Sequence, residues 1–388
     1  ARGGRAAAPG EGATVGPAAV GVRRGALRRR AGFFTPDGVR DQRRRARIAA
    51  ALEAASVIVL ADGDADGLGA ATLIRERYDA HVPAAAVAPR LQDDAEETTV
   101  PQSTVAVLPT GPYHLLERLA LLTELGIDGR PVYVCDLCPD DADAIAEALA
   151  PVTAQTDSVV WFDHHRWGDD ARAAVEAAGV ALTVGDSETV CTTDVAAAAL
   201  ETTLPEHLTA LAAVTRDHDL WINDDPRSCD LADLAYWTDP ETYMATVAAH
   251  GPDLPDVAAA YLSTRRTRKQ ALVDLAVERG ELVAAGPWTV GLTYGRCAQN
   301  EVADGLRDRG ADAAVIIKPA GSISIRGSAD FERAHEVAGA LGGGGHPRAA
   351  GCKPDIYDDM LAYAEHWVTR GAAARQRVLA AFEALETD

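Results

Sequence analysis

Short apolar runs alternate with helical patterns along the first part of the chain. The runs are rich in Val, Ile and aromatic residues, a composition that predicts strands. The predicted strand and helix pairs are 57–60 with 69–78, 132–135 with 140–150, and 158–162 with 169–178. Strands that are apolar on both faces and alternate with helices are typical of a doubly wound, mainly parallel sheet. We therefore predict an α/β fold.

A second strand and helix pattern follows a long polar helix predicted over 257–279. Its strands are expected at 288–293, 313–317 and 322–326, with a helix at 299–309 and a glycine-rich turn at 342–345. The boundaries that these patterns predict are a basic, partly disordered arm over 1–48, a first domain over 49–250, a helical linker over 251–285 and a smaller α/β domain over 286–388.

The acidic net charge of the chain does not decide whether it binds nucleic acid. The net charge is −21, and the basic residues are almost all arginine, which resembles proteins of salt-loving microbes. At high salt the long-range field is screened within a few Å, so this charge does not exclude nucleic acid. Residues 1–47 hold twelve arginines against three acids, which leaves two alternatives, an arm that touches a phosphate backbone or a tail without a role.

The apolar runs are too short to predict a membrane span. The first residues carry Arg2 and Arg5 but no continuous apolar stretch, which argues against a secretory signal. We therefore expect a cytoplasmic protein with no membrane partner.

Three carboxylates follow the first predicted strand at every second position, as Asp62, Asp64 and Asp66. In an extended loop alternate side chains share a face, so the three could converge on a hard cation such as Mg²⁺ or Mn²⁺. A calcium loop is the rival interpretation, but it requires an entering helix and a Glu at its twelfth position, where this chain has Leu73.

Acidic and imidazole side chains also follow the other two predicted strands. Asp136 follows the second, and Asp163, His164 and His165 follow the third. Carboxyl ends of parallel strands meet at one edge of a sheet, where ligands of such folds bind. A fourth candidate, Asp217, lies at the end of a predicted helix in the segment 215–221.

These motifs resemble those of a known family. The succession DGDADG, CDLC, FDHH and RDHDLW is similar to the four motifs of the DHH phosphoesterase superfamily, and GGGGHPRAAG at 342–351 resembles the signature of its associated C-terminal domain. Asp62 stands where many members have His, as in RecJ-type exonucleases. With the salt-adapted composition, this favours a compact, archaeal RecJ-like protein.

The resemblance implies a site for two divalent cations, with Mn²⁺ preferred over Mg²⁺. One ion would be held by Asp62, Asp64 and Asp136, and the other by Asp66, Asp136, His164 and Asp217. Asp219 is the alternative to Asp217. Asp163 would orient its neighbouring histidine, and His165 would contact the scissile phosphate.

The same resemblance implies that the second domain grasps a phosphate. Its expected substrate contacts are the guanidinium of Arg326, the backbone of Gly344 and Gly345, and the side chain of His346. Glycines there would let backbone amides approach an anion closely.

The expected activity is hydrolysis of phosphodiester bonds in single-stranded DNA or RNA from an end, by a hydroxide that two metal ions activate. Alternatives within the same chemistry are a nuclease for very short RNA, a phosphatase for 3′-phosphoadenosine 5′-phosphate and a cyclic-dinucleotide phosphodiesterase. A catalytically idle scaffold with replication or repair partners is the alternative of another class.

Overall fold

The computed structural model describes residues 37–92, 101–200, 202–356 and 359–385. Most of the predicted basic arm therefore lies outside the described residues. The first described element is the helix α2 (Asp37–Glu53). None of the described helices is long and apolar enough to cross a membrane.

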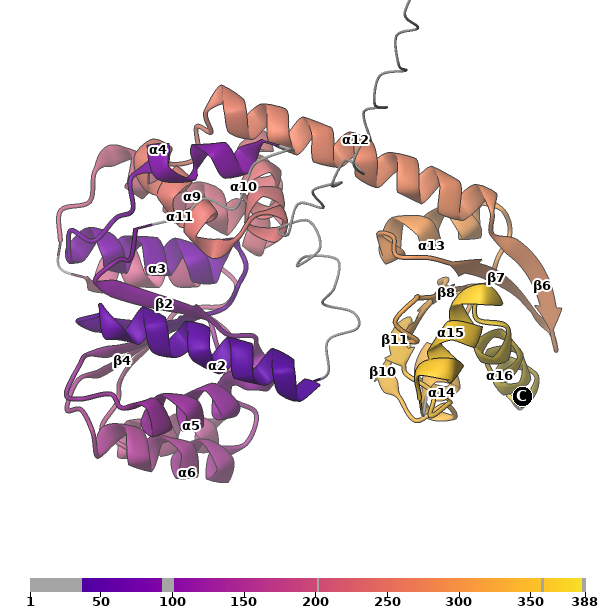
Figure 1. Cartoon of the computed structure of the whole chain (residues 1–388), viewed down its shortest axis with the longest axis horizontal. Coiled ribbons are helices and arrows are strands. Elements are labelled where there is room, and N and C mark those ends of the chain that lie inside the picture. The colour runs from indigo at the N-terminus through magenta and orange to yellow at the C-terminus, as the bar shows by residue number, and fades with distance from the viewer. Residues whose placement is uncertain (1–36, 93–100, 201, 357–358, 386–388) are drawn as a thin grey trace, which may run out of the picture. The chain divides into compact units, whose positions relative to one another are not determined.

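Five parallel strands form the first sheet, in the order β2-β1-β3-β4-β5 (Figure 1). The α/β fold with a parallel sheet is confirmed. The strands β1 (Val57–Ala61), β3 (Val132–Cys135) and β4 (Val159–Asp163) are those predicted, and β2 (Val105–Pro109) and β5 (Ala181–Val184) complete the sheet. β1 and β3 are buried along their whole length, which explains their continuous apolar sequences.

Helices cover both faces of this sheet. Figure 1 shows α5 and α6 on one face and α3, α9, α10 and α11 on the other. The elements are α3 (Ala65–Arg77), α4 (Ala84–Val87), η2 (Ala88–Leu91), η3 (Pro112–His114), α5 (Leu115–Leu125), α6 (Ala142–Thr153), α7 (Asp169–Ala177), α8 (Thr192–Ala199), α9 (Glu206–Asp219), α10 (Pro226–Trp237) and α11 (Pro240–His250).

Helix α3 begins earlier than its apolar pattern predicts, because Asp64 caps it. The Asp64 carboxylate accepts hydrogen bonds of 3.0 Å from the amides of Asp66 and Gly67. Asp66 consequently lies in the first helical turn. The expected extended run over 62–66 therefore ends at Asp64, and Asp66 belongs to the helix instead.

Glycine is required at two positions where α3 packs closely against neighbouring backbone and side chains. A Cβ atom on Gly67 would lie 2.6 Å from the carbonyl oxygen of Asp62, and one on Gly69 would lie 2.5 Å from Oγ1 of Thr193. These close approaches bring the start of α3 against the end of β1 and against α8.

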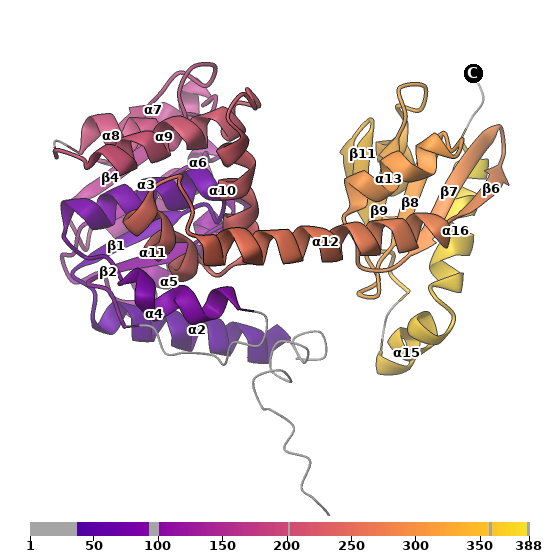
Figure 2. The ribbon, with the colours of Figure 1, turned by 90° about the horizontal axis from the view of Figure 1, so that it is seen from above.

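The second sheet has six strands in the order β10-β11-β9-β8-β7-β6. Figure 2 shows α13 and α16 on opposite faces, and α14 shares a hydrophobic core with α16. Its neighbouring strands are antiparallel except for β7 and β8. The elements from the long helix onward are α12 (Asp256–Glu278), β6 (Glu281–Ala285), β7 (Trp288–Tyr294), α13 (Gln299–Asp308), β8 (Ala313–Ile317), β9 (Ile323–Gly327), α14 (Ala334–Gly339), β10 (Gly344–His346), β11 (Ala349–Cys352), α15 (Met360–Val368) and α16 (Ala372–Glu383).

A partly buried ion pair fixes the far end of α3. The Arg75 side chain is 1% exposed and donates to both carboxylate oxygens of Glu241 in α11, at 2.7 and 2.6 Å. It also donates to the carbonyl oxygen of Val105 in β2. The pair therefore ties together α3, α11 and the edge of the sheet.

We expect Glu241→Ala to destabilise the protein by about 2 kcal/mol, because it leaves the Arg75 charge buried without its partner. The measurement is the free energy of unfolding from urea titration. The control is Glu176→Ala, which removes the exposed i,i+4 pair with Arg172 and should change stability by less than about 0.5 kcal/mol. Equal effects of the two substitutions would contradict the assigned role of Arg75.

Candidate metal and phosphate site

The functional side chains gather where three adjacent parallel strands end. Asp62, Asp136 and Asp163 stand at the carboxyl ends of β1, β3 and β4, which are neighbours in the sheet. The amide of Asp62 donates to the carbonyl oxygen of Cys135, and the amide of Asp136 donates to that of Phe162. These bonds continue the sheet ladder and hold the first residue past each strand against the next strand.

One group of possible ligands consists of Asp62, Asp64 and Asp136, whose carboxylate oxygens lie within 4.8 Å of one another. Asp136 adopts a left-handed backbone conformation with φ of 61°. Asp tolerates this region better than most residues do. The turn places its carboxylate above the sheet edge, where Asp62 and Asp64 also lie.

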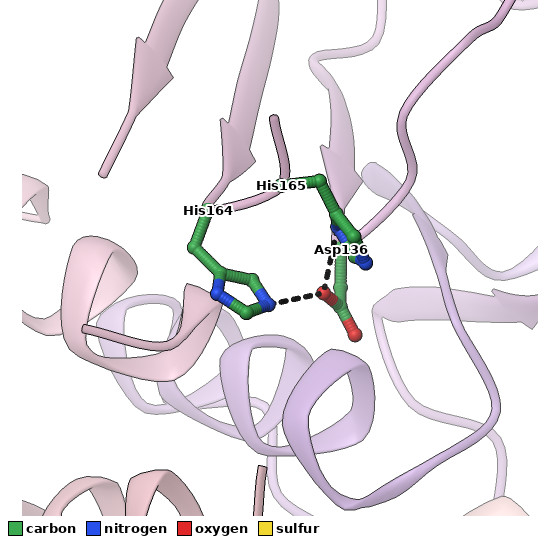
Figure 3. A group of neighbouring side chains, drawn as sticks. All are labelled: Asp136, His164 and His165. Carbon is green, nitrogen blue, oxygen red and sulfur yellow. Dashed lines mark ion pairs between the residues drawn. The ribbon is translucent and has the colours of Figure 1, made fainter. Parts of the chain in front are cut away.

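A second group consists of Asp66, His164 and Asp219, and a third of Asp136, His164 and His165. The His164 Nε2 atom lies 3.2 Å from Asp219 Oδ2, 3.7 Å from Asp136 Oδ1 and 3.8 Å from Asp66 Oδ2. Figure 3 shows Asp136 between the two histidine rings. Asp136 and His164 therefore connect the three groups.

Asp217, expected as a ligand, does not belong to these groups. Its carboxylate oxygens accept hydrogen bonds from the amides of Asp224 and Asp225, at 3.0 and 3.2 Å. Asp219, two residues further along α9, is the one that reaches His164. Residues two apart on a helix point about 200° apart, so only one of the two can face the group. The geometry therefore favours the alternative, Asp219, as the candidate ligand from α9.

The carboxylates of these groups repel one another. Burial, followed by the charges of Asp66 and Asp64, raises the pKa of Asp136 well above its usual range. The same causes raise the pKa of Asp219 to about 7. Burial and the charge of Asp64 raise the pKa of Asp62.

The donor set fits divalent cations. In the described parts of the chain, no Lys or Arg side chain forms an ion pair with these carboxylates, whose ion-pair partners are histidines. The Asp219 Oδ2 atom is buried and accepts no hydrogen bond within the described residues. Carboxylates with one imidazole suit Mn²⁺ or Mg²⁺, and a cation would relieve the repulsion that raises their pKa values.

The ring that Asp163 positions is that of His165, whereas its contact with the neighbouring His164 is to the backbone amide. The Asp163 side chain is fully buried, and its Oδ1 accepts from the amides of His164 and His165 and lies 2.7 Å from His165 Nδ1. The Trp167 indole donates to Oδ2 at 3.0 Å. The hydrogen bond to Asp163 raises the pKa of His165, whose side chain is 49% exposed. A ring held in this orientation and half exposed suits contact with an anion.

The start of α8 holds two of the carboxylates, which the sequence patterns do not reveal. The amides of Thr192 and Thr193 donate to Asp66 Oδ2 and Oδ1, at 2.7 and 2.8 Å. The Thr192 hydroxyl donates to Asp136 Oδ1 at 3.0 Å. All four side chains are buried. The residues Cys191 and Asp194 form a capping box, which marks the start of a helix. This pattern does not indicate that the helix start binds Asp66 and Asp136.

The expected residues of the second domain lie in one row of its sheet. Arg326 in β9 pairs with Ala349 in β11, which pairs with His346 in β10. Directly paired residues project to the same face, so the side chains of Arg326 and His346 flank the small Ala349. Arg326 is anchored by a 2.9 Å hydrogen bond to Asn300 in the first turn of α13.

The expected turn at 342–345 is instead partly a strand, since Gly344 and Gly345 belong to β10. Gly345 has φ of 142°, and a Cβ atom there would lie 2.6 Å from the carbonyl oxygen of Ala349. Glycine is needed at this position for close packing between strands. All residues of β10 are exposed, so its backbone is accessible to a ligand.

A cavity of about 1060 Å³ opens beside the carboxylates of the first sheet. Asp62, Asp136, His164, His165 and Asp219 all line it. Its size exceeds the roughly 300–1,000 Å³ of ordinary small-molecule sites, so it has room for a nucleotide or more.

No family model and no curated protein matches the sequence. Solved structures match the fold. Exonuclease RecJ bound to manganese superposes with a TM-score of 0.51 at 14% identity, over 88% of this chain and 95% of that one. A DHH domain from the s1p family of ribosomal proteins has a TM-score of 0.49 at 14% identity, and the match covers 93% of this chain and 97% of that one. A pGpG-specific phosphodiesterase from Vibrio cholerae has a TM-score of 0.45 at 12% identity, and the match covers 83% of this chain and 98% of that one. The first of these shows that the chain has the fold of RecJ, which confirms the resemblance to the DHH phosphoesterases at the level of fold.

We expect Thr192→Val to weaken Mn²⁺ binding about ten-fold, because Asp136 loses the hydrogen bond that orients its carboxylate. Thr192→Ser should restore binding. The measurement is titration calorimetry with Mn²⁺. The control is Thr246→Val, a buried threonine of α11 whose hydroxyl bonds the carbonyl oxygen of Thr242. Unchanged Mn²⁺ affinity in Thr192→Val would refute this role.

The raised pKa of Asp219 predicts a dependence of stability on pH in the metal-free protein. Between about pH 4 and 7 the folded state binds more protons at this carboxyl than the unfolded state does, so the free energy of unfolding falls as pH rises through that window. Asp219→Asn should reduce the loss of stability between about pH 4 and 7, measured by urea unfolding with a chelator. Asp140→Asn, an exposed carboxyl beside the cavity, is the control. The same pH dependence in Asp219→Asn as in the unsubstituted protein would contradict the prediction.

Proposed function

We propose that the protein is a metal-dependent phosphodiesterase of the DHH type that hydrolyses single-stranded nucleic acid from an end. The observation that carries the proposal is Asp136, whose carboxylate connects two groups of ligand atoms at one sheet edge. The RecJ-like fold supports the same chemistry, since the matching structure is an exonuclease bound to manganese.

In this proposal two divalent cations bind at the sheet edge. Asp62, Asp64 and Asp136 would hold one, and Asp66, Asp136, His164 and Asp219 the other. Mn²⁺ is favoured over Mg²⁺ because an imidazole belongs to the set. The ions supply a Lewis acid that makes water nucleophilic at neutral pH and offsets negative charge on the phosphate.

The residues of the chain position the substrate. The His165 ring donates a hydrogen bond to a phosphate oxygen, and Asp163 keeps this ring in place. Arg326 and His346 bind a further phosphate through their cationic or donor groups, beside the exposed backbone of Gly344 and Gly345. No protein nucleophile is required.

Asp136→Asn should lower the hydrolysis rate of end-labelled single-stranded oligonucleotides at least about 100-fold with Mn²⁺ present, because it removes the ligand common to both ions. The matched control is Asp140→Asn, which also lines the cavity but belongs to none of the ligand groups. Activity of Asp136→Asn near that of the unsubstituted protein would refute the proposal.

The same assay separates the substrate classes. Loss of long single strands of DNA or RNA supports an exonuclease. Cleavage confined to oligomers of a few nucleotides, to 3′-phosphoadenosine 5′-phosphate or to cyclic dinucleotides would assign the protein to a small-nucleotide enzyme instead. Metal binding without turnover of any of these would support a scaffold.

A further inference from the structure

Two aromatic side chains border the cavity without packing into the core. Tyr113 in η3 is 95% exposed and Trp221, just past α9, is 79% exposed. The other aromatic residues of the motifs differ from them. Trp161 and Phe162 are buried in the core, and Trp167 is bound to Asp163. Large exposed rings at the border of a site are a common mark of ligand binding.

The backbone holds Trp221 in an unfavourable conformation. Its φ is 56°, in the left-handed region that bulky residues rarely adopt, and Asn223 has φ of 55°. Such conformations persist where surrounding structure enforces them, and they cluster at ligand-binding sites.

Asp217 provides that enforcement. Its carbonyl oxygen accepts hydrogen bonds from the amides of Ile222 and Asn223, and its carboxylate accepts from those of Asp224 and Asp225. Four bonds to one residue thus fix the segment 222–225 directly after Trp221. Asp217, which lies outside the ligand groups, positions this aromatic side chain instead.

The two sides of the cavity offer different chemistry. Its inner wall carries the ligand carboxylates and His165, which suit a phosphate and its cations. Its border carries Tyr113, Trp221 and the apolar Leu116, which is 40% exposed. The His218 ring lies 5.9 Å from the Trp221 ring at 32° and supports it from one direction. A ligand that matches both sides has a phosphate attached to a flat, uncharged ring.

We propose that Trp221, with Tyr113, binds the nucleobase adjoining the phosphate held at the sheet edge. The inference rests on the proposed function, because it names the part of a nucleotide that these rings recognise. Stacking on an aromatic face accepts any base, so the rings favour nucleotides over base-free phosphodiesters without reading sequence.

Binding is tested first, by quenching of tryptophan fluorescence in the full chain with Mn²⁺. Adenosine 5′-monophosphate should quench the tryptophan fluorescence of the unsubstituted protein. It should also quench the fluorescence of the control variant Trp367→Leu, which lacks a tryptophan of α15. It should not quench Trp221→Leu. Ribose 5-phosphate, which lacks the base, should quench none of them. Undiminished quenching in Trp221→Leu would overturn the inference.

Hydrolysis provides the second test. The substrates are a thymidine pentamer and the same pentamer with base-free tetrahydrofuran units at both ends. Trp221→Leu and Tyr113→Leu should each raise KM for the first about ten-fold and leave KM for the second unchanged. Trp221→Phe should retain most of the preference. Tyr236→Leu, which removes an equally exposed ring of α10, is the control.

The two proposals fail in different ways. If no phosphodiester is hydrolysed, the proposed function is refuted, while the fluorescence titration still decides whether Trp221 binds a base. If hydrolysis occurs and Trp221→Leu raises KM equally for both pentamers, the proposed function stands and base recognition is refuted.

Discussion

Repulsion among carboxylates at the edge of the first sheet is the constraint to which the rest of the site responds. Asp66 and Asp136 are buried, and Asp62, Asp64 and Asp219 lie beside them. A negative charge is costly to bury without a partner. The chain supplies only part of the compensation, through His164 and the start of α8, and cations would supply the remainder. The site is in this sense built for a ligand of opposite charge.

The sequence predicted most of the first sheet and the residues at its edge, for a physical reason. Three buried strands had clear apolar patterns, and parallel strands must bring their carboxyl ends together. Asp62, Asp136 and His164 could therefore be grouped without coordinates. The remaining strands, β2 and β5, escaped prediction; β5 is only partly buried, whereas β2 is buried at four of its five residues.

The errors have equally local causes. Asp64 caps α3, a role that depends on backbone geometry, so the alternating carboxylates were assigned to an extended loop. Alignment with the motif favoured Asp217 over Asp219, whereas the direction of α9 places Asp219 beside His164. Thr192 bonds Asp136, which is 56 residues away, and Asp66, which is 126 residues away, so tertiary packing alone reveals its role.

The bonds at the start of α8 couple the two carboxylates mechanically. Asp66 is held by the amides of α8 and Asp136 by its Thr192 hydroxyl, so the placement of this one helix sets the positions of both carboxylates. Gly69 allows α3 to lie this close to α8, since a Cβ atom there would lie 2.5 Å from Oγ1 of Thr193. A substitution on the buried face of α8, at Val195 or Ala196 in the hydrophobic core, would therefore act on both carboxylates without replacing either of them.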